Sequence, residues 1–197
     1  RELDSVVIAT DSQRVENAMQ ELDIPVELTG SNHSTGTERV AEVASRHKDE
    51  IVINIQGDEP FISPDIIDGA VLLLLEEKSI QMSTAASLYL SQDEWENPNV
   101  VKVELDDDGF AKDFFRVPEG EQSTKHLKHI GIYTFRREYL LKLVKMEKSS
   151  REIERRLEQM RAMDIDCKMG VFVTEYDVIG VNTPDDLNAL IEDMGIA

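Results

Sequence analysis

The sequence has little cysteine and little positive charge. Its 197 residues include a single cysteine, Cys167, which excludes an internal disulfide and suits a reducing compartment, so we expect a cytoplasmic protein. Lysine and arginine number 21 against 40 aspartates and glutamates, for a formal net charge of -19. Coating a nucleic acid or binding a membrane surface requires a basic patch, so this balance disfavours both kinds of partner. Small anionic ligands stay compatible, because a few local cations suffice to bind them.

Long apolar runs are also absent. The run "AVLLLL" at residues 70–75 is far shorter than a membrane span and is typical of a buried helix face. No signal-peptide pattern is present. The strand-like "SVVIATDS" begins at residue 5, from which we expect the chain to start inside a domain, with an upstream strand missing. At 41% hydrophobic residues, the chain can bury the core of one domain, with or without a small lobe.

Strand-like and helix-like segments alternate along the chain, which is typical of a layered α/β domain. We expect strands over 5–11, 25–29, 51–55, 129–135 and 170–176, and helices over 12–22, 34–47, 63–77, 137–146, 149–163 and 183–194. The continuous apolar run at 51–55 is of the kind found in a parallel sheet covered on both faces. Residues 100–116 indicate two antiparallel strands around an Asp-rich turn closed by Gly109. The β-rich insertion around 97–135 therefore predicts a smaller lobe.

The stretch "IVINIQGDEP", residues 51–60, brings two adjacent carboxylates to the end of a buried strand. Ligands of an open parallel sheet gather beyond the carboxyl ends of its strands, and Asp58 follows such an end. A carboxylate there suits Mg²⁺, which prefers oxygen ligands and brings a polyphosphate with it. The alternative is that Asp58 and Glu59 are solvated turn residues and that Glu59-Pro60 simply ends the strand. This stretch alone leaves both interpretations open.

Three further stretches carry polar groups in positions that favour ligand binding. The loop "NHSTGTERV" opens a helix whose free N–H groups suit a phosphate or a base. In "VNTPDDL", Thr183 and Pro184 indicate a helix start that explains the two following Asp residues, while Asn182 would lie at a strand-to-helix corner. A third set of donors lies in the insertion and suggests a local anion site, although a lone His on a strand is more often a core or surface residue. Its members are Arg116, Lys125, His126, Lys128, His129 and Tyr133.

Seven short motifs follow one another in the order "ATD", "STGTERVAE", "IVINIQGDEP", "NPNVVKV", "KHIGIYTFR", "LEQMRAM" and "GVNTPDDL". In this order, from Ser5 to about Leu190, the chain resembles the 3-deoxy-manno-octulosonate (KDO) cytidylyltransferase family, the CMP-KDO synthetases. The resemblance implies a three-layer, Rossmann-like α/β fold of the nucleotide-diphospho-sugar transferase type, in one domain over 1–197. Residues 97–135 would form its smaller lobe, for sugar binding and dimerisation. It further implies a Mg²⁺-dependent homodimer that joins CTP and an eight-carbon 3-deoxy-ulosonic acid, giving CMP-KDO and pyrophosphate for lipopolysaccharide synthesis.

The resemblance also assigns roles residue by residue. The matched positions are Asp58 and Asn182 for the metal; Thr37, Arg39 and Gln56 for the nucleotide; and Arg116, His129, Tyr133, Glu158 and Gln159 for the sugar acid. Asp58 and Arg116 are the catalytic candidates among them. Glu158 and Gln159 are neighbours on the helix expected over 149–163, so both reach one ligand only if it caps or flanks that helix.

The chain departs from the family pattern in three places. Nothing matches the opening strand and basic Gly/Pro loop that embrace the triphosphate. Asn182 stands where the family usually has a second metal-binding Asp, so it offers an amide oxygen but no charge. The stretch "FFRVPEGEQSTKHLKH" is short for the loop between Arg116 and His129. The alternatives are therefore a sister enzyme for 8-amino-KDO or a sialic-type acid, and a degenerate non-catalytic relative.

Overall fold

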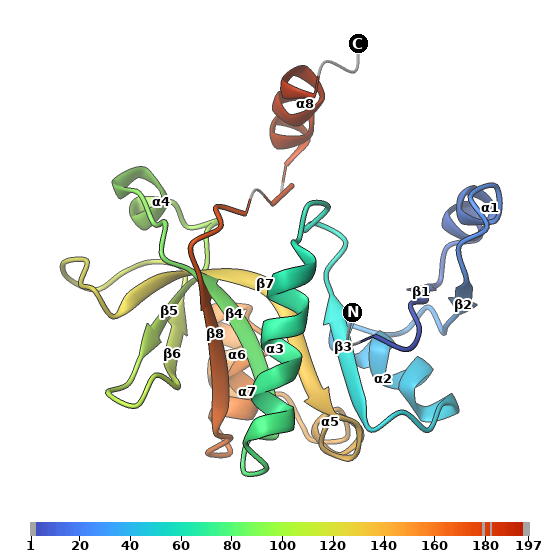
Figure 1. The fold of residues 1–197 in the computed structure, drawn as a ribbon, viewed down its shortest axis with the longest axis horizontal. Coiled ribbons are helices and arrows are strands. Elements are labelled where there is room, and N and C mark those ends of the chain that lie inside the picture. The colour runs from blue at the N-terminus through green and yellow to red at the C-terminus, as the bar shows by residue number, and fades with distance from the viewer. Residues whose placement is uncertain (1–2, 179, 182, 195–197) are drawn as a thin grey trace.

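The computed structural model describes residues 3–178, 180–181 and 183–194. Its elements, labelled in Figure 1, are β1 (Ile8–Thr10), α1 (Gln13–Gln20), β2 (Val26–Leu28), α2 (Gly36–Arg46), β3 (Ile51–Ile55), α3 (Pro64–Glu76), β4 (Met82–Ser87), α4 (Gln92–Glu96), β5 (Lys102–Leu105), β6 (Ala111–Phe115), β7 (His126–Arg136), α5 (Arg137–Leu143), α6 (Ser150–Arg155), α7 (Met160–Met163), β8 (Met169–Thr174) and α8 (Pro184–Asp193). The sequence analysis did not anticipate β4 and α4.

Six strands form one mixed sheet in the order β6-β5-β7-β4-β8, and β3 pairs with β7 off this path. β4 occupies one edge of the eleven-residue strand β7, whose other edge is shared by two strands. β5 pairs with residues 126–128 of β7, and β3 with residues 132–136. His129 N donates to Val101 O (2.9 Å), and Gln56 N donates to Gly131 O (3.2 Å). The edge of β7 therefore passes from β5 to β3 at residues 129–131, where these two strands diverge.

The parallel pairing expected for residues 51–55 is wrong for the strands described. β3 runs antiparallel to β7, with Ile51 opposite Arg136 and Ile55 opposite Ile132. The parallel pairs in this part of the chain are β1–β2 and β4–β8. A continuous apolar run indicates that both faces of a strand are buried, but it does not predict whether the neighbouring strand runs parallel or antiparallel.

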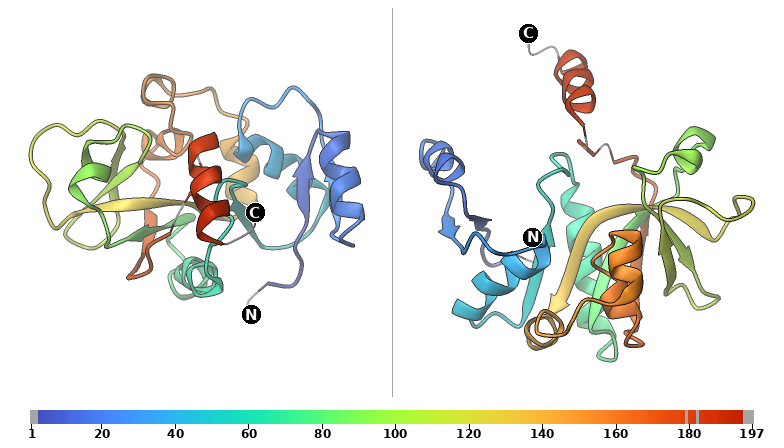
Figure 2. Two further views of the ribbon diagram at one scale, coloured as in Figure 1. Left: turned by 90° about the horizontal axis from the view of Figure 1, so that it is seen from above. Right: turned by 180° about the vertical axis from the view of Figure 1, so that it is seen from behind.

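Helices cover both faces of the sheet, so the expected three-layer α/β fold is confirmed (Figure 2). α3 packs on one face, and an added Cβ at Gly69 would lie 2.4 Å from the Phe172 ring of β8, so only glycine fits there. The core on that face contains Ile66, Ala85, Ile130, Ile132 and Val178. α2, α5, α6 and α7 lie on the other face, over a core that includes Phe114, Tyr133, Phe135, Leu140, Met160 and Met169.

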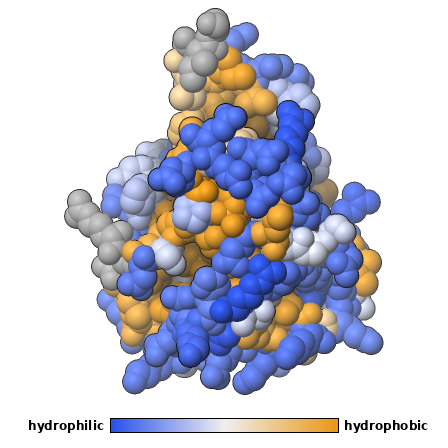
Figure 3. All heavy atoms as spheres, turned by 90° about the vertical axis from the view of Figure 1, so that its right-hand side faces the viewer, coloured by the Kyte–Doolittle hydropathy of each residue, from blue (hydrophilic) through white to orange (hydrophobic). Residues whose placement is uncertain are grey.

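Two parts project from this core. α1 with the β1–β2 pair lies beyond β3, and α2 contacts both β1 and β3 (Figure 1). The side that carries β1 and β2 is hydrophilic with an apolar area between its charged groups (Figure 3). α8 stands away from the sheet at the top of Figure 1. Large apolar side chains are exposed on both parts: Val6, Leu22, Leu28, Leu187, Ile191 and Met194. Within the described ranges, none of the helices is long and apolar enough to cross a membrane.

The start and turn positions expected from the sequence are confirmed. Ser63 caps α3 by accepting from Asp65 N at 3.3 Å, with Pro64 in the first turn. Thr183 opens α8 in a capping box with Asp186. Gly109 closes the β5–β6 hairpin at φ +85°, in the left-handed region that glycine tolerates best.

The single helix expected over 149–163 is divided into α6 and α7. Arg156 ends α6 in the left-handed conformation at φ 54°, and a buried ion pair then closes the two helices on each other. The Arg161 guanidinium donates to both carboxylate oxygens of Glu152, at 2.7 and 2.6 Å. Arg161 is 5% exposed and Glu152 is 4% exposed. Glu158 and Gln159 therefore lie in the turn before α7, not on one continuous helix.

We expect Arg161→Met to lower the free energy of unfolding by about 3–5 kcal/mol, because Glu152 is left as an uncompensated buried charge. Urea denaturation measures this loss, and adding Glu152→Gln to Arg161→Met should recover part of it. Lys112→Met is the matched control, since Lys112 pairs with Glu104 at the surface and its loss should cost at most ~1 kcal/mol. Similar losses for Arg161→Met and Lys112→Met would contradict a supporting role for the buried pair.

Candidate active site

A row of polar side chains crosses the sheet where β3 and β5 part. Asn54 on β3 lies opposite Tyr133 on β7, and Tyr133 lies opposite Thr84 on β4. All three are buried, and Tyr133 belongs to the core under α2 and α7. Directly opposed residues of antiparallel strands share a face, so the row lies on that face of the sheet. The His129 ring lies on it too, with its centroid 5.4 Å from that of Tyr133.

His129 is a neutral hydrogen-bond donor. Its Nε2 lies 2.9 Å from Thr84 Oγ1, which itself donates to Ile132 O at 2.7 Å. Because the hydroxyl has one proton and gives it to a carbonyl, His129 donates through Nε2 and keeps Nδ1 as an acceptor. Burial, and after it the charge of Arg116, lowers the pKa of His129 to about 3, so the ring is uncharged at neutral pH.

Three charged side chains act on the Tyr133 phenol. Burial raises the pKa of the Tyr133 phenol well above its ordinary value, and the Glu158 carboxylate is the next largest cause. Asp58 acts in the same direction and Arg116 in the opposite one. Glu158, Arg116 and Asp58, which come from three different parts of the chain, thus all act electrostatically on this buried phenol.

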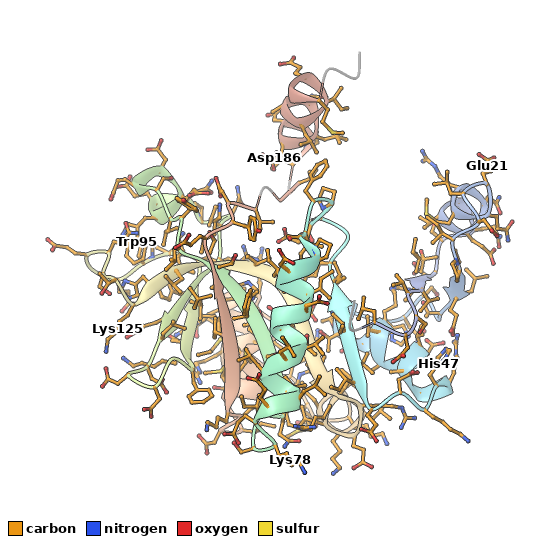
Figure 4. All side chains as sticks on the ribbon, viewed as in Figure 1. Glu21, His47, Lys78, Trp95, Lys125 and Asp186 are labelled. Atoms are coloured by element: carbon orange, nitrogen blue, oxygen red, sulfur yellow. The ribbon has the colours of Figure 1, made fainter. Side chains whose placement is uncertain are left out.

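Arg116, at the end of β6, differs in its partners from Lys125 and Lys128. Its Nη1 donates to the carbonyls of residues 98 and 99, each at 3.3 Å. In the described part of the chain it forms no ion pair with a carboxylate, whereas Lys128 binds Glu94 and Asp177, and Lys125 pairs with an aspartate of the β5–β6 turn. The anion site expected from the whole set of donors thus reduces to Arg116. Figure 4 shows Lys125 at the outer, left-hand edge of this region, below Trp95 in that view.

The strand-end motif "QGDE" is tied to the middle of β7. Glu59 Oε1 accepts a hydrogen bond from Gly131 N at 2.9 Å, and a Cβ at Gly131 would lie only 3.0 Å from that oxygen. Gln56 lies beside the same glycine. Burial raises the pKa of the Glu59 carboxyl, with a smaller contribution from Asp58. Glu59 is therefore not the solvated turn residue of the alternative interpretation, and its anchoring holds half-buried Asp58 at the sheet.

The N-terminus of α2 already binds a carboxylate. Gly36 N donates to Glu158 Oε1 at 3.3 Å, and Thr37 N donates to Glu158 Oε2 at 3.1 Å. These are free N–H groups of a helix start, where an anion is favoured. The nucleotide-type loop and a residue expected at the sugar-acid site are thus in direct contact.

Two buried amides at this place have no hydrogen-bond partner among the described residues. They are Asn54 Nδ2 and Gln159 Nε2, on side chains that are 4% and 3% exposed. A Cβ built on Gly36 would lie 3.8 Å from Asn54 Nδ2, so this donor lies next to the start of α2. Buried donors are nearly always satisfied in folded proteins, so unpaired ones mark a place where a ligand group can bind.

Arg39 lies toward β1 and β2. Its guanidinium donates to Thr29 Oγ1 at 2.5 Å and to Gly30 O at 3.3 Å, and it lies 3.3 Å from an Asp11 carboxylate oxygen. No contact joins it to Tyr133 or Asp58 in the described part of the chain. Arg39 thus borders the site on the side of the β1–β2 pair. Thr37 is connected to the site by the hydrogen bond from its backbone N–H to Glu158.

Asp58 is the candidate carboxylate for a magnesium ion here. Among the described residues no group of three or more His, Cys, Asp or Glu side chains could hold a metal ion. Mg²⁺ is usually held by one or two carboxylates together with substrate phosphates, so Asp58 fits such a site. Val181 N donates to Asp58 O at 2.8 Å, which brings the segment before Asn182 to Asp58. Asn182 itself lies outside the described residues.

Comparison with known proteins identifies the family of this chain. A family model described as "Cytidylyltransferase" matches residues 1–169. The chain belongs to the cytidylyltransferase family. It is 39% identical to the 3-deoxy-manno-octulosonate cytidylyltransferase of Geobacter sulfurreducens, over 98% of this chain and 83% of the relative. It is 42% identical to that of Solibacter usitatus, over 94% of this chain and 75% of the relative.

A solved structure agrees with these relatives. It is CMP:2-keto-3-deoxy-manno-octonic acid synthetase complexed with CTP, and it matches with a TM-score of 0.89 at 31% identity, over 98% of this chain and 81% of that one. The resemblance to the 3-deoxy-manno-octulosonate cytidylyltransferases, a family of nucleotidyltransferases, is thereby confirmed.

The sequence analysis missed three residues of this candidate site. Asn54 and Thr84 are short polar residues inside buried strands, where they resemble ordinary strand positions. The third, Lys102, has its Nζ 2.8 Å from Arg116 O. The motif "NPNVVKV" that contains Lys102 was recognised, and a lysine between two valines was the available indication that its side chain is internal.

Asn54→Val should raise the free energy of unfolding by about 1–3 kcal/mol, because it removes a buried donor without a partner. Thermal unfolding in the absence of ligands is the measurement. Thr84→Val is the contrasting variant, since it removes a hydroxyl that bonds both His129 and Ile132, and it should lower the melting temperature. A lower melting temperature for Asn54→Val would show that the amide is satisfied in the free protein.

His129 should make the protein sensitive to acid. Its pKa in the folded state, about 3, is below the ordinary histidine value, so its contribution to stability is present above about pH 6.5 and is lost as the pH falls toward 3. Between pH 6.5 and 4.5 the loss amounts to about 2–3 kcal/mol. Urea denaturation at these two pH values should show a smaller decline for His129→Gln than for the wild type. An unchanged decline would place the acid-sensitive group elsewhere, and His47→Gln, at an exposed position, is the control.

Proposed function

We propose that the protein is a Mg²⁺-dependent cytidylyltransferase that joins CTP to KDO, giving CMP-KDO and pyrophosphate for lipopolysaccharide synthesis in the cytoplasm. One observation supports the sugar acid above all. Arg116 is a cation without a carboxylate partner in the described part of a protein of charge -19, and its charge contributes to lowering the pKa of His129. An arginine fork binds both oxygens of a carboxylate, which suits the acid group of KDO.

The neighbouring side chains suit the rest of such a sugar. His129 Nδ1 can accept a hydrogen bond from a sugar hydroxyl, because its Nε2 proton is engaged by Thr84. Asn54 Nδ2 and Gln159 Nε2 offer donors to sugar or nucleotide oxygens. Tyr133, with its raised pKa, stays a protonated phenol at neutral pH. We therefore assign the carboxylate to Arg116 and the hydroxyls to His129, Tyr133, Glu158 and Gln159.

The nucleotide would lie over the start of α2, next to Thr37, Gln56 and Arg39. In the reaction the anomeric C2 hydroxyl of the sugar attacks the α-phosphorus of CTP in line. A new O–P bond forms, the bond to the bridging oxygen breaks, pyrophosphate leaves with the electron pair, and the hydroxyl proton passes to solvent. The protein's part is to hold the two reactants in this geometry and to offset the charge on the phosphoryl oxygens.

Asp58, together with Asn182, would hold the metal ion. Bound Mg²⁺ supplies charge that offsets the phosphates and lowers the pKa of the attacking hydroxyl. Glu59 contributes by fixing the Asp58 loop to Gly131 N. We further propose that the enzyme acts as a homodimer, with residues 97–135 as its sugar and dimerisation lobe. In the structure β5, β6 and β7 of this lobe continue the main sheet.

Two rivals are separated by one assay. A panel of CTP with KDO, 8-amino-KDO and a sialic-type acid, read by pyrophosphate release, distinguishes the proposed enzyme from a sister enzyme. A protein that binds CTP and releases no pyrophosphate with any of the three acids is the non-catalytic relative.

Asp58→Asn should reduce kcat for CMP-KDO formation by about 10²-fold or more at saturating Mg²⁺, because it removes the charged metal ligand and keeps the side-chain shape. Pyrophosphate release measures the rate, and the melting temperature verifies that the fold is intact. Asp49→Asn, at an exposed position beyond α2, is the matched control and should keep wild-type rates. An Asp58→Asn protein with most of its Mg²⁺-dependent activity would exclude Asp58 from the metal site.

A further inference from the structure

One lysine is completely buried next to the proposed sugar-acid site. Lys102 on β5 is 0% exposed, and its Nζ donates to Asn97 O at 2.7 Å and to Arg116 O at 2.8 Å. No carboxylate forms an ion pair with it in the described ranges. Lysines are rarely buried completely, and an ammonium held by carbonyls alone is costly to desolvate. A neutral side chain would fill the same space at lower cost, so the charge itself needs an explanation.

Lys102 and Arg116 hold the same turn. Lys102 bonds the carbonyl of residue 97, and Arg116 Nη1 bonds those of residues 98 and 99. Three consecutive carbonyls therefore face two cations. Lys102 also bonds the carbonyl of Arg116 itself, while Arg155 Nη1 donates to Phe114 O at 2.7 Å and fixes the strand just before it. The backbone that carries Arg116 is thus anchored from two sides.

We propose that Lys102 is a positioning residue for Arg116. It fixes the Arg116 backbone and the 97–99 turn so that the guanidinium faces the carboxylate of the sugar acid, and its buried charge adds to the attraction for that carboxylate. This inference rests on the proposed function, since it concerns how the same site recognises an acid. It assigns to the "NPNVVKV" motif a role in acid selection.

The charge of Lys102 should couple acid binding to pH. Burial, and after it Arg116, lowers the pKa of Lys102 to about 8, while Glu94 acts in the opposite direction. Lys128, its cross-strand neighbour on β7, is paired with Glu94 and Asp177. A carboxylate bound at Arg116 favours the protonated form of Lys102. Affinity for the acid is therefore highest below about pH 8 and declines as the pH rises through that value.

The test is calorimetric titration of KDO into the full chain at pH 7, 8 and 9, each in two buffers of different ionisation enthalpy. Wild-type affinity should fall about tenfold from pH 7 to pH 9, with proton uptake on binding near pH 8. Lys102→Met, which keeps the length and loses the charge, should bind KDO about tenfold more weakly at pH 7 and without this pH dependence. Lys112→Met, on the neighbouring strand of the same hairpin, should behave as the wild type.

Lys102→Gln keeps a hydrogen-bond donor group without the charge, and it replaces Lys102→Met if that variant fails to fold. It too should bind KDO independently of pH. Titration with CTP monitors the rest of the site and should give the same affinity in all variants. Equal KDO affinities in wild type and Lys102 variants, or a flat wild-type profile from pH 7 to 9, would overturn the inference and leave the proposed function standing. A wild-type protein that binds CTP and no KDO would overturn both.

Discussion

The long strand β7 is the constraint on which the site depends. It pairs with β4 along one edge and with both β5 and β3 along the other, so three strands take their register from it. Its residues 129–131, where β5 and β3 part, carry the histidine of the site and the glycine that anchors Glu59. Every polar side chain of the buried row is placed by this pairing. A shift of one residue in register would turn them to the opposite face.

Local patterns in the sequence predicted most elements, because they depend on neighbouring residues alone. The caps of α3 and α8, the turn at Gly109 and the apolar face of α3 are of this kind. β4 was missed because its sequence "MSTAAS" has the small polar residues of a loop, although all six residues are buried and the strand lies between β7 and β8. The break at Arg156 was missed because it depends on the pairing of Arg161 with Glu152, which folds the chain back on itself.

The site itself was predicted by resemblance for the residues that motifs mark, and less well for those that support them. Glu158 was placed on a helix beside a ligand, whereas it bonds the first amides of α2. That contact joins segments more than a hundred residues apart, so it cannot be predicted from the spacing of residues along the chain. Asn54 and Thr84 could be recognised as members of the polar row only from the strand register, which pairs both with Tyr133. The direction of β3 likewise follows from its partner and not from its own residues.

The contact of Glu158 with α2 has a consequence for how two ligands would share this protein. An internal anion holds the two amides, so an outside anion that binds them must first displace it. Because the Glu158 carboxylate also raises the pKa of the Tyr133 phenol, displacing it would change the electrostatic environment of that side chain. A ligand bound at the start of α2 would then change the affinity for a ligand near Tyr133, and the reverse. By thermodynamic reciprocity the gain or loss is the same whichever molecule arrives first.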